Sequence, residues 1–411
     1  MQLLSWFLLV ASPEATACEG TLTRDTVVAC ARANSPTVLA DRERVAAAAG
    51  DREAARVLLP SNPELSFSAA HRVNDRGEDA RNLYGSLSQE LELGGQRRKR
   101  MEVAAAAERA ASHRVAVTER DVVAQALFAY YDALAARREI EVVQGTTDTA
   151  VRLEEAARGR TEAGAGAAIE ADLAAAETVG LREQLALARG RAEAAEARLA
   201  ALVGRQPGAA LQLEGTLEPL TTTARASVDE RPELGEAIAG ERVASGTIDR
   251  LRRMRAPNLR VSFIAQYDGY RERVLGGGLS LPIPLPAPLG RTYKGELAAA
   301  RAHARQARAR TQAVRRTLTL EVALAQAEMR ARSSAAAAYA AETIARARED
   351  LRQIADHAAA GRIDLREALL TQRILLGLLL RQVEAQHELC RASVELARVL
   401  GALDAAGAGE R

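Results

Sequence analysis

The chain has 411 residues, with 56 basic and 54 acidic side chains and a formal net charge of +2. Only 3% of the residues are aromatic, which favours helices packed through small side chains over a large globular core. The charged residues are mixed along the sequence, so no basic block predicts a nucleic-acid-binding surface.

Residues 1–11 form a short apolar run, and the predicted signal peptide 1–17 ends in Ala15-Thr16-Ala17. The run is too short to span a bilayer. Its small-x-small ending is typical of a secretory signal peptide, although the usual positive charge is missing; a ragged helix start is the alternative. Cys18 follows the predicted cleavage site and is a candidate for lipidation. Cys30 and Cys390 are interpreted as small apolar helix residues rather than a metal pair.

Two long proline-free stretches, 64–206 and 289–411, predict long helices. In the first stretch, residues spaced alternately four and three apart form a coiled-coil seam: Leu181, Leu185, Ala188, Ala192, Ala195, Leu199 and Leu202. The seam recurs 197 residues later, from Leu378 to Val399, and Gly204 corresponds to Gly401. A unit of roughly 195 residues therefore occurs twice.

Each repeat also contains segments in which apolar and polar residues alternate, at about 62–93 and about 257–284. Period two predicts one β-hairpin per repeat, with polar turns at 74–79 and 268–273. Four strands cannot close a barrel, and lipid does not tolerate open sheet edges. If the strands enter a membrane, several copies must therefore contribute; a hairpin that only caps a helical bundle is the alternative.

These patterns divide the chain into a first repeat at 18–204, a linker at 205–227, a second repeat at 228–402 and a disordered tail at 403–411. We expect each repeat to run through a helix, the hairpin, a long helix, a tip and a return helix. The tips are expected at about 159–168 and 359–364. The long helix from Gln96 would measure about 90 Å, and an equally long run starts at Arg291.

Several segments resemble the TolC-like outer-membrane efflux family, closest to its cobalt-zinc-cadmium resistance branch. They are Asn62-Pro63-Glu64-Leu65, the run from Leu87 to Arg97 and the proline-rich run from Leu281 to Gly290. Residues 162–170 and 361–369 resemble the two helical tips of that family. The resemblance covers residues 21–402.

The resemblance implies a mainly α fold with a small β part and a homotrimer in the outer membrane. Twelve strands from three chains would form a β-barrel in contact with outer-membrane lipid, and the long antiparallel helical hairpins would form a periplasmic α-barrel. Such a protein is a passive duct for small solutes, here heavy-metal cations as the first expectation. An inner-membrane pump of the resistance-nodulation-division type would deliver the cargo through a periplasmic adaptor, or membrane fusion protein.

The alternative is a periplasmic adaptor or a structural coiled-coil protein of an export assembly. An adaptor usually has one helical hairpin between β-rich domains, whereas this sequence has two complete units. The five histidines show no ligand spacing, and no phosphate loop or catalytic elbow is present. We therefore expect no enzyme activity, no cofactor and no fixed metal site.

Three carboxylates fall where the family carries acidic residues near the pore tip: Glu170, Asp364 and Glu367. In three copies they would form a cation-attracting ring; alternatively they are solvated acids at helix starts, where the helix dipole favours them. Arg362 either joins the hairpins by a salt bridge or is exposed.

Glycines and prolines mark the predicted bends. Gly164 and Gly361 would allow the tight reversals at the tips, where an adaptor would dock. The strand-to-helix transitions are predicted at Gly94, Gly95, Pro282, Pro284, Pro286 and Gly290. Few aromatic residues are available to mark the membrane interface: Phe67, Tyr84, Phe263, Tyr267 and Tyr270.

Overall fold

A computed structural model describes residues 18–73, 77, 79–222, 227–269, 272–283, 285–286, 288–290 and 292–403. Four parts of the sequence predictions lie outside these residues: the signal peptide, residues 404–411 of the tail, Tyr270 and Pro284. The chain divides into two compact units, one from Met1–Leu39, Val117–Val228 and Thr317–Arg411, the other from Ala40–Ala116 and Asp229–Arg316. The prediction of a mainly helical fold with four strands is confirmed.

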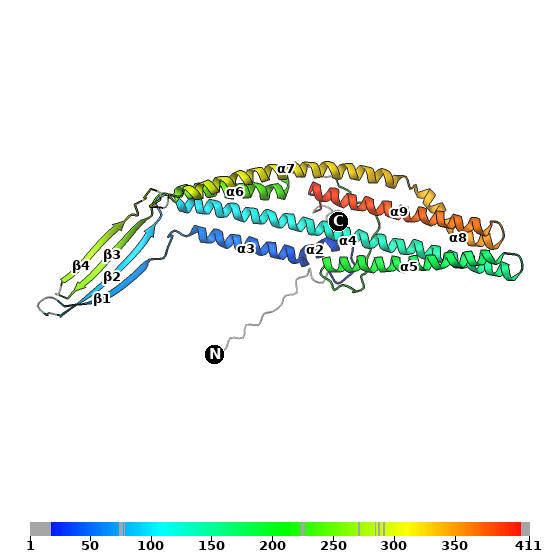
Figure 1. Cartoon of the computed structure of the whole chain (residues 1–411), viewed down its shortest axis with the longest axis horizontal. Helices are drawn as coiled ribbons and strands as arrows, with labels where there is room; N and C mark the ends of the chain where they lie inside the picture. Colours follow the sequence, from blue (N-terminus) through cyan, green and yellow to red (C-terminus); the bar gives the residue numbers. More distant parts are fainter. Residues whose placement is uncertain are drawn as a thin grey trace. The chain divides into compact units, whose positions relative to one another are not determined.

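The second unit contains one antiparallel sheet with the strand order β1-β2-β3-β4 (Figure 1). Its strands are β1 (Glu64–Val73), β2 (Asp79–Leu91), β3 (Leu259–Asp268) and β4 (Glu272–Ser280). The register aligns Leu65 with Leu87, Leu87 with Phe263, and Phe263 with Gly277. Because side chains alternate along a strand, this register places the apolar side chains of Leu65, Phe67, Leu87, Phe263, Leu275 and Leu279 on one face of the sheet.

The helices of the second unit are α6 (Pro232–Arg253), most of α3 (Pro36–Arg56), and the N-terminal parts of α4 (Gln96–Glu162) and α7 (Lys294–Ala337). Arg100 of α4 forms hydrogen bonds with the backbone at the end of α3. Its guanidinium donates hydrogen bonds to the carbonyl oxygens of Ala55 and Val57, at 3.3 and 3.2 Å, and to Oε1 of Glu92 at 2.7 Å. One side chain thus binds the C-terminal carbonyl groups of one helix and the chain leaving β2.

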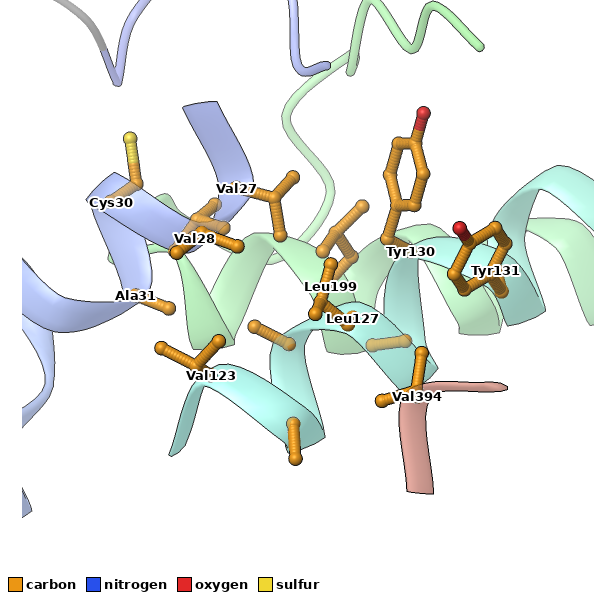
Figure 2. Packing of buried hydrophobic residues seen from close by; sticks show 14 of the residues in the cluster. Val27, Val28, Cys30, Ala31, Val123, Leu127, Tyr130, Tyr131, Leu199 and Val394 are labelled. Atoms are coloured by element: carbon orange, nitrogen blue, oxygen red, sulfur yellow. The ribbon is translucent and has the colours of Figure 1, made fainter. Parts of the chain in front are cut away.

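The first unit contains α2 (Arg24–Asn34), α5 (Ala168–Leu202), α8 (Ala341–Ala359), α9 (Leu365–Leu400) and the remainder of α4 and α7. Figure 2 shows the centre of its core, where Val123 and Leu127 of α4 lie with Val27 of α2, Leu199 of α5 and Val394 of α9. Helices from both sequence repeats therefore share one apolar core.

Two adjacent tyrosines of α4 hold the segment that links the repeats. The hydroxyl of Tyr130 donates to the carbonyl oxygen of Glu214 at 2.7 Å, and that of Tyr131 to Glu218 at 2.9 Å. Burial raises the pKa of both hydroxyls, that of Tyr130 to about 12, so both remain donors at neutral pH.

The N-terminal segment is attached to α2 by a disulfide between Cys18 and Cys30. The interpretation of Cys30 as a simple apolar residue is therefore wrong, because its sulfur is bonded to a partner 12 residues away. A sulfur in a disulfide is not available for a lipid thioether, so this bond and lipidation of Cys18 exclude each other. Cys390 is a buried free thiol whose pKa burial raises to about 12.

The second long helix differs from the expected continuous run between residues 291 and 358. It is interrupted after Ala337, and α8 begins at Ala341 following an extended residue, Ala340, with φ −56° and ψ 135°. No proline causes the break. At the break Tyr339 N donates to the Ala336 carbonyl at 3.1 Å, and the Tyr339 side chain packs against a buried cluster that includes Ile344 and Leu379.

Candidate functional site: the helical tips

The tips at the ends of α4 and α8 have the same backbone geometry. Gly164 and Gly361 adopt left-handed φ values of 72° and 69°. The following residues close the turns, since Ala165 N donates to the Arg160 carbonyl at 2.8 Å and Arg362 N to the His357 carbonyl at 2.9 Å. Both turns are Schellman motifs, in which a left-handed residue lets the chain reverse after the helix.

The return helices start without side-chain caps. Ala167 precedes α5, and Asp364 precedes α9 in an extended conformation with φ −66° and ψ 145°. Aspartate in this position commonly accepts a hydrogen bond from the first turn, but the Asp364 side chain makes no such bond. Its carboxylate is exposed and remains available to solvent ions or to a partner.

A small apolar core joins the two tips within the first unit. Its buried residues come from all four helices: Leu153, Ala157, Ala174, Ile354, Ala355, Ala358, Leu365, Ala368 and Leu369. Polar contacts reinforce it, because Arg373 of α9 pairs with Glu177 of α5 at 2.6 Å and Gln372 donates to the Thr146 carbonyl of α4 at 3.0 Å. The two helical hairpins are therefore packed against each other rather than independent.

The structure places the predicted tip residues at the same end of these packed helices. Glu170 is half-buried beside Ala171, while Arg362, Asp364 and Glu367 are exposed. Within the described residues, no hydrogen bond or ion pair joins these four side chains to one another. Arg362 thus adopts the exposed alternative in a single chain, and the acids present unpaired negative charge at the tip.

The predicted strand-to-helix transitions lie in the second unit. Gly95 has a left-handed φ of 76°, and a Cβ on Gly94 would approach the Cβ of Ala256 to 2.7 Å. After β4, Gly290 N donates to the Pro286 carbonyl at 3.0 Å, and strand pairing ends at Ser280, two residues before Pro282. The chain can bend between β2 and α4 because Gly94 and Gly95 have no side chain.

A charged cluster that was not anticipated lies between α4 and α9 in the first unit. Oδ1 of Asp132 lies 2.7 Å from Nε2 of His387 and 2.6 Å from a guanidinium nitrogen of Arg391. Burial alone would raise the pKa of Asp132, but the hydrogen bonds from His387 and Arg391 outweigh it and the pKa is lowered. The four-residue spacing of His387 and Arg391 places them one helical turn apart, and this can be read from the sequence. The sequence does not show that Asp132 lies beside them.

Comparison with known proteins shows which family the chain resembles. Residues 27–205 match the model of the outer membrane efflux protein family. Over these residues the chain is similar to that family. It is similar to the cobalt-zinc-cadmium resistance protein CzcC of Cupriavidus metallidurans, with 26% identity over 285 residues, and the alignment covers 64% of each chain.

Solved structures of outer-membrane channels have the same fold. CusC aligns with a TM-score of 0.77 and 15% identity over 92% of this chain and 91% of its own. The Neisseria gonorrhoeae channel MtrE aligns with a TM-score of 0.76 and 17% identity over 92% and 89%. The Vibrio cholerae protein VceC gives 0.71 and 18% over 92% and 96%. The predicted resemblance to the outer-membrane efflux family and to its heavy-metal branch is confirmed by the family match and by the similarity to CzcC.

Proposed function

We propose that this chain is the outer-membrane channel of a tripartite efflux system and acts as a passive duct in a homotrimer. The observation that carries the proposal is the open, four-stranded sheet with one exposed apolar face. Leu65, Phe67, Leu275 and Leu279 on this face are between 73% and 79% exposed. Such a face in water would favour aggregation, whereas lipid would cover it.

The two sheet edges support a particular association of copies. In one chain β1 and β4 each have one paired neighbour, and lipid requires every backbone donor and acceptor to be paired. Pairing β1 of one copy with β4 of the next satisfies both edges. Three copies give twelve strands, which is wide enough for a channel, whereas about eight strands give a filled interior.

The opposite face of the sheet suits a water-filled lumen. Across the strands it carries Ser66, Ser86, Ile264 and Gly276 in one row, and the hydroxyl oxygens of Ser66 and Ser86 lie 2.7 Å apart. The two serines and Gly276 of this row are small and leave room inside a closed barrel. The alternation of apolar and polar faces is that of a membrane barrel strand.

Unpartnered apolar pairs in the first unit supply surfaces for other chains. Ile169 and Leu173 on α5 are 71% and 50% exposed, and Leu370 and Ile374 on α9 are both 59% exposed. Each pair is spaced by four residues and occupies one helix face. We assign these surfaces to neighbouring copies and to a periplasmic adaptor that docks at the Gly164 and Gly361 tips and connects to a resistance-nodulation-division pump.

Heavy-metal cations are the proposed cargo. The support is the similarity to CzcC together with the exposed acids at the tip. Three copies would place up to nine carboxylates from Glu170, Asp364 and Glu367 around one axis, where their field attracts cations and repels anions.

Planar-bilayer conductance of the purified protein tests this function with two adjacent substitutions. Leu87→Lys places a charge on the apolar face of the central strand β2, at a cost of about 2–4 kcal/mol if the site is near the bilayer midplane. Ser86→Lys places the same charge on the polar face. We expect the first variant to insert poorly and the second to insert normally and lose cation preference.

Two results would contradict the proposal. Wild-type protein that is soluble without detergent and gives no conductance would favour the periplasmic adaptor or structural coiled coil. Equal insertion of both lysine variants would show that the apolar face does not meet lipid.

A further inference from the structure

A cavity of about 570 Å³ lies where the strands join the helices of the second unit. Its walls come from the chain between β2 and α4, the end of α6, the start of β3 and the segment between β4 and α7. The polar wall includes Glu92, Gln96, Arg100, Arg250, Arg255 and Asn258. None of these residues belongs to the tip site.

Three buried polar atoms around this cavity have no hydrogen-bond partner in the described chain. Gln96 is 5% exposed, and its Nε2 donates to the Ala256 carbonyl and to Oδ1 of Asn258, but its Oε1 accepts nothing. Glu92 uses Oε1 for Arg100 at 2.7 Å and leaves Oε2 unpaired, although its side chain is only 9% exposed. Nε of Arg250 is the third atom. A buried polar group without a partner is unfavourable, so these atoms indicate a ligand with both a donor and an acceptor.

The other wall of the cavity is apolar and exposed. Met254, Ile283 and Leu285 line it and are 38%, 81% and 51% exposed. Leu281, 55% exposed, continues this apolar surface toward β4. A ligand that satisfies both walls has a charged head group and a hydrocarbon part.

We propose that this cavity binds the head group of a zwitterionic phospholipid with a primary ammonium, such as phosphatidylethanolamine. The phosphate is placed against Arg250 and Arg255, and the ammonium donates to Oε2 of Glu92 and Oε1 of Gln96. The acyl chains lie over Ile283 and Leu285. The assignment rests on the proposed function, because it requires the strands to be in a membrane.

The chemistry of the unpaired atoms selects this class of lipid. Two unpaired acceptors require N–H or O–H donors, which the trimethylammonium of phosphatidylcholine lacks. An unpaired guanidinium N–H beside a second arginine suits a phosphate, because charge-assisted hydrogen bonds to oxyanions are the stronger kind. A bare metal cation fits poorly beside three guanidinium groups.

Native mass spectrometry of the full-length protein tests the site by counting lipid retained from mixed micelles. Phosphatidylethanolamine and phosphatidylcholine with identical acyl chains are offered in equal amounts. One charge-assisted hydrogen bond corresponds to about tenfold in affinity or more, so we expect at least that preference for phosphatidylethanolamine. Equal retention of the two lipids overturns the proposal.

Two arginines near the end of α6 provide a matched pair of variants. Arg250→Gln removes the unpaired donor and should lower phosphatidylethanolamine retention about tenfold. Arg253→Gln removes the same charge from an exposed position outside the cavity and should leave retention unchanged. Arg255→Gln serves as a second test if Arg250→Gln fails to assemble. Equal losses in a cavity variant and in Arg253→Gln would show only diffuse charge attraction and overturn the site.

Soluble phosphoethanolamine and a conductance measurement on the same preparations separate the remaining outcomes. Binding of soluble phosphoethanolamine without lipid retention would make the ligand a free solute and overturn the lipid assignment. Normal conductance without lipid preference would overturn this inference and leave the channel function standing. Lipid preference without conductance would support the cavity and count against the channel.

Discussion

Replacing Gly361 with alanine tests whether the tip turn depends on a left-handed residue. The φ of Gly361 is 69°, and an added Cβ would meet no atom within 4 Å. The cost is therefore conformational rather than steric: about 1–2 kcal/mol for an L-residue in this region. The lower entropy of the unfolded alanine chain offsets about 0.4–1 kcal/mol of it. We expect a net loss of roughly 1 kcal/mol, or about fivefold in local opening.

Gly180→Ala is the matched control. Gly180 lies inside α5, has no positive φ, and an added Cβ there also has no atom within 4 Å. Alanine in a helix interior is more favourable than glycine by about 0.5–1 kcal/mol. The same chemical change is therefore expected to destabilise the tip and stabilise α5.

Hydrogen exchange of the assembled protein, followed by mass spectrometry, measures both the destabilised tip and the stabilised α5. Peptides spanning residues 355–370 should exchange faster in Gly361→Ala, and peptides spanning 175–190 should exchange more slowly in Gly180→Ala. If both variants shift exchange in the same direction, or if Gly361→Ala leaves the tip unchanged, the assigned turn geometry is wrong.

Other variants test the tip and the cluster between α4 and α9. Gly164→Pro imposes a φ near −65° where the structure has 72°, so export should fail while the amount in the outer membrane is unchanged; normal export would refute the tip placement. Asp364→Asn with Glu367→Gln should lower cation preference, read as the reversal potential across a salt gradient, and an unchanged potential would return both residues to solvated helix-start acids. Asp132→Asn removes a carboxylate whose pKa is lowered, so wild type should be more stable than the variant at pH 7. That stability is lost as pH falls below the usual aspartate range. A difference in denaturant midpoint that persists unchanged in strong acid would contradict this reasoning.

Local sequence patterns were sufficient for the elements and for the tips. The Schellman turns depend only on a glycine at the end of a helix, and the repeat put Gly164 and Gly361 in corresponding positions. Strand alternation is similarly local, so the apolar face of the sheet could be derived from period two together with the register.

Features that depend on contacts distant in sequence could not be predicted. The second long helix is interrupted where Tyr339 packs against a buried cluster, and no proline or glycine in the neighbouring sequence signals a break. Asp132 and His387 are separated by 255 residues. The cavity collects Glu92, Arg250 and Ile283 from different elements, and its unpaired atoms are visible only once hydrogen bonds are assigned.

The number of chains in the folded particle tests the central claim most directly. Native mass spectrometry of protein released from detergent should give one species with three times the mass of the processed chain, because β1 and β4 can then pair around a closed ring. A stable folded monomer, or a ladder of species extending beyond three chains, would contradict the account.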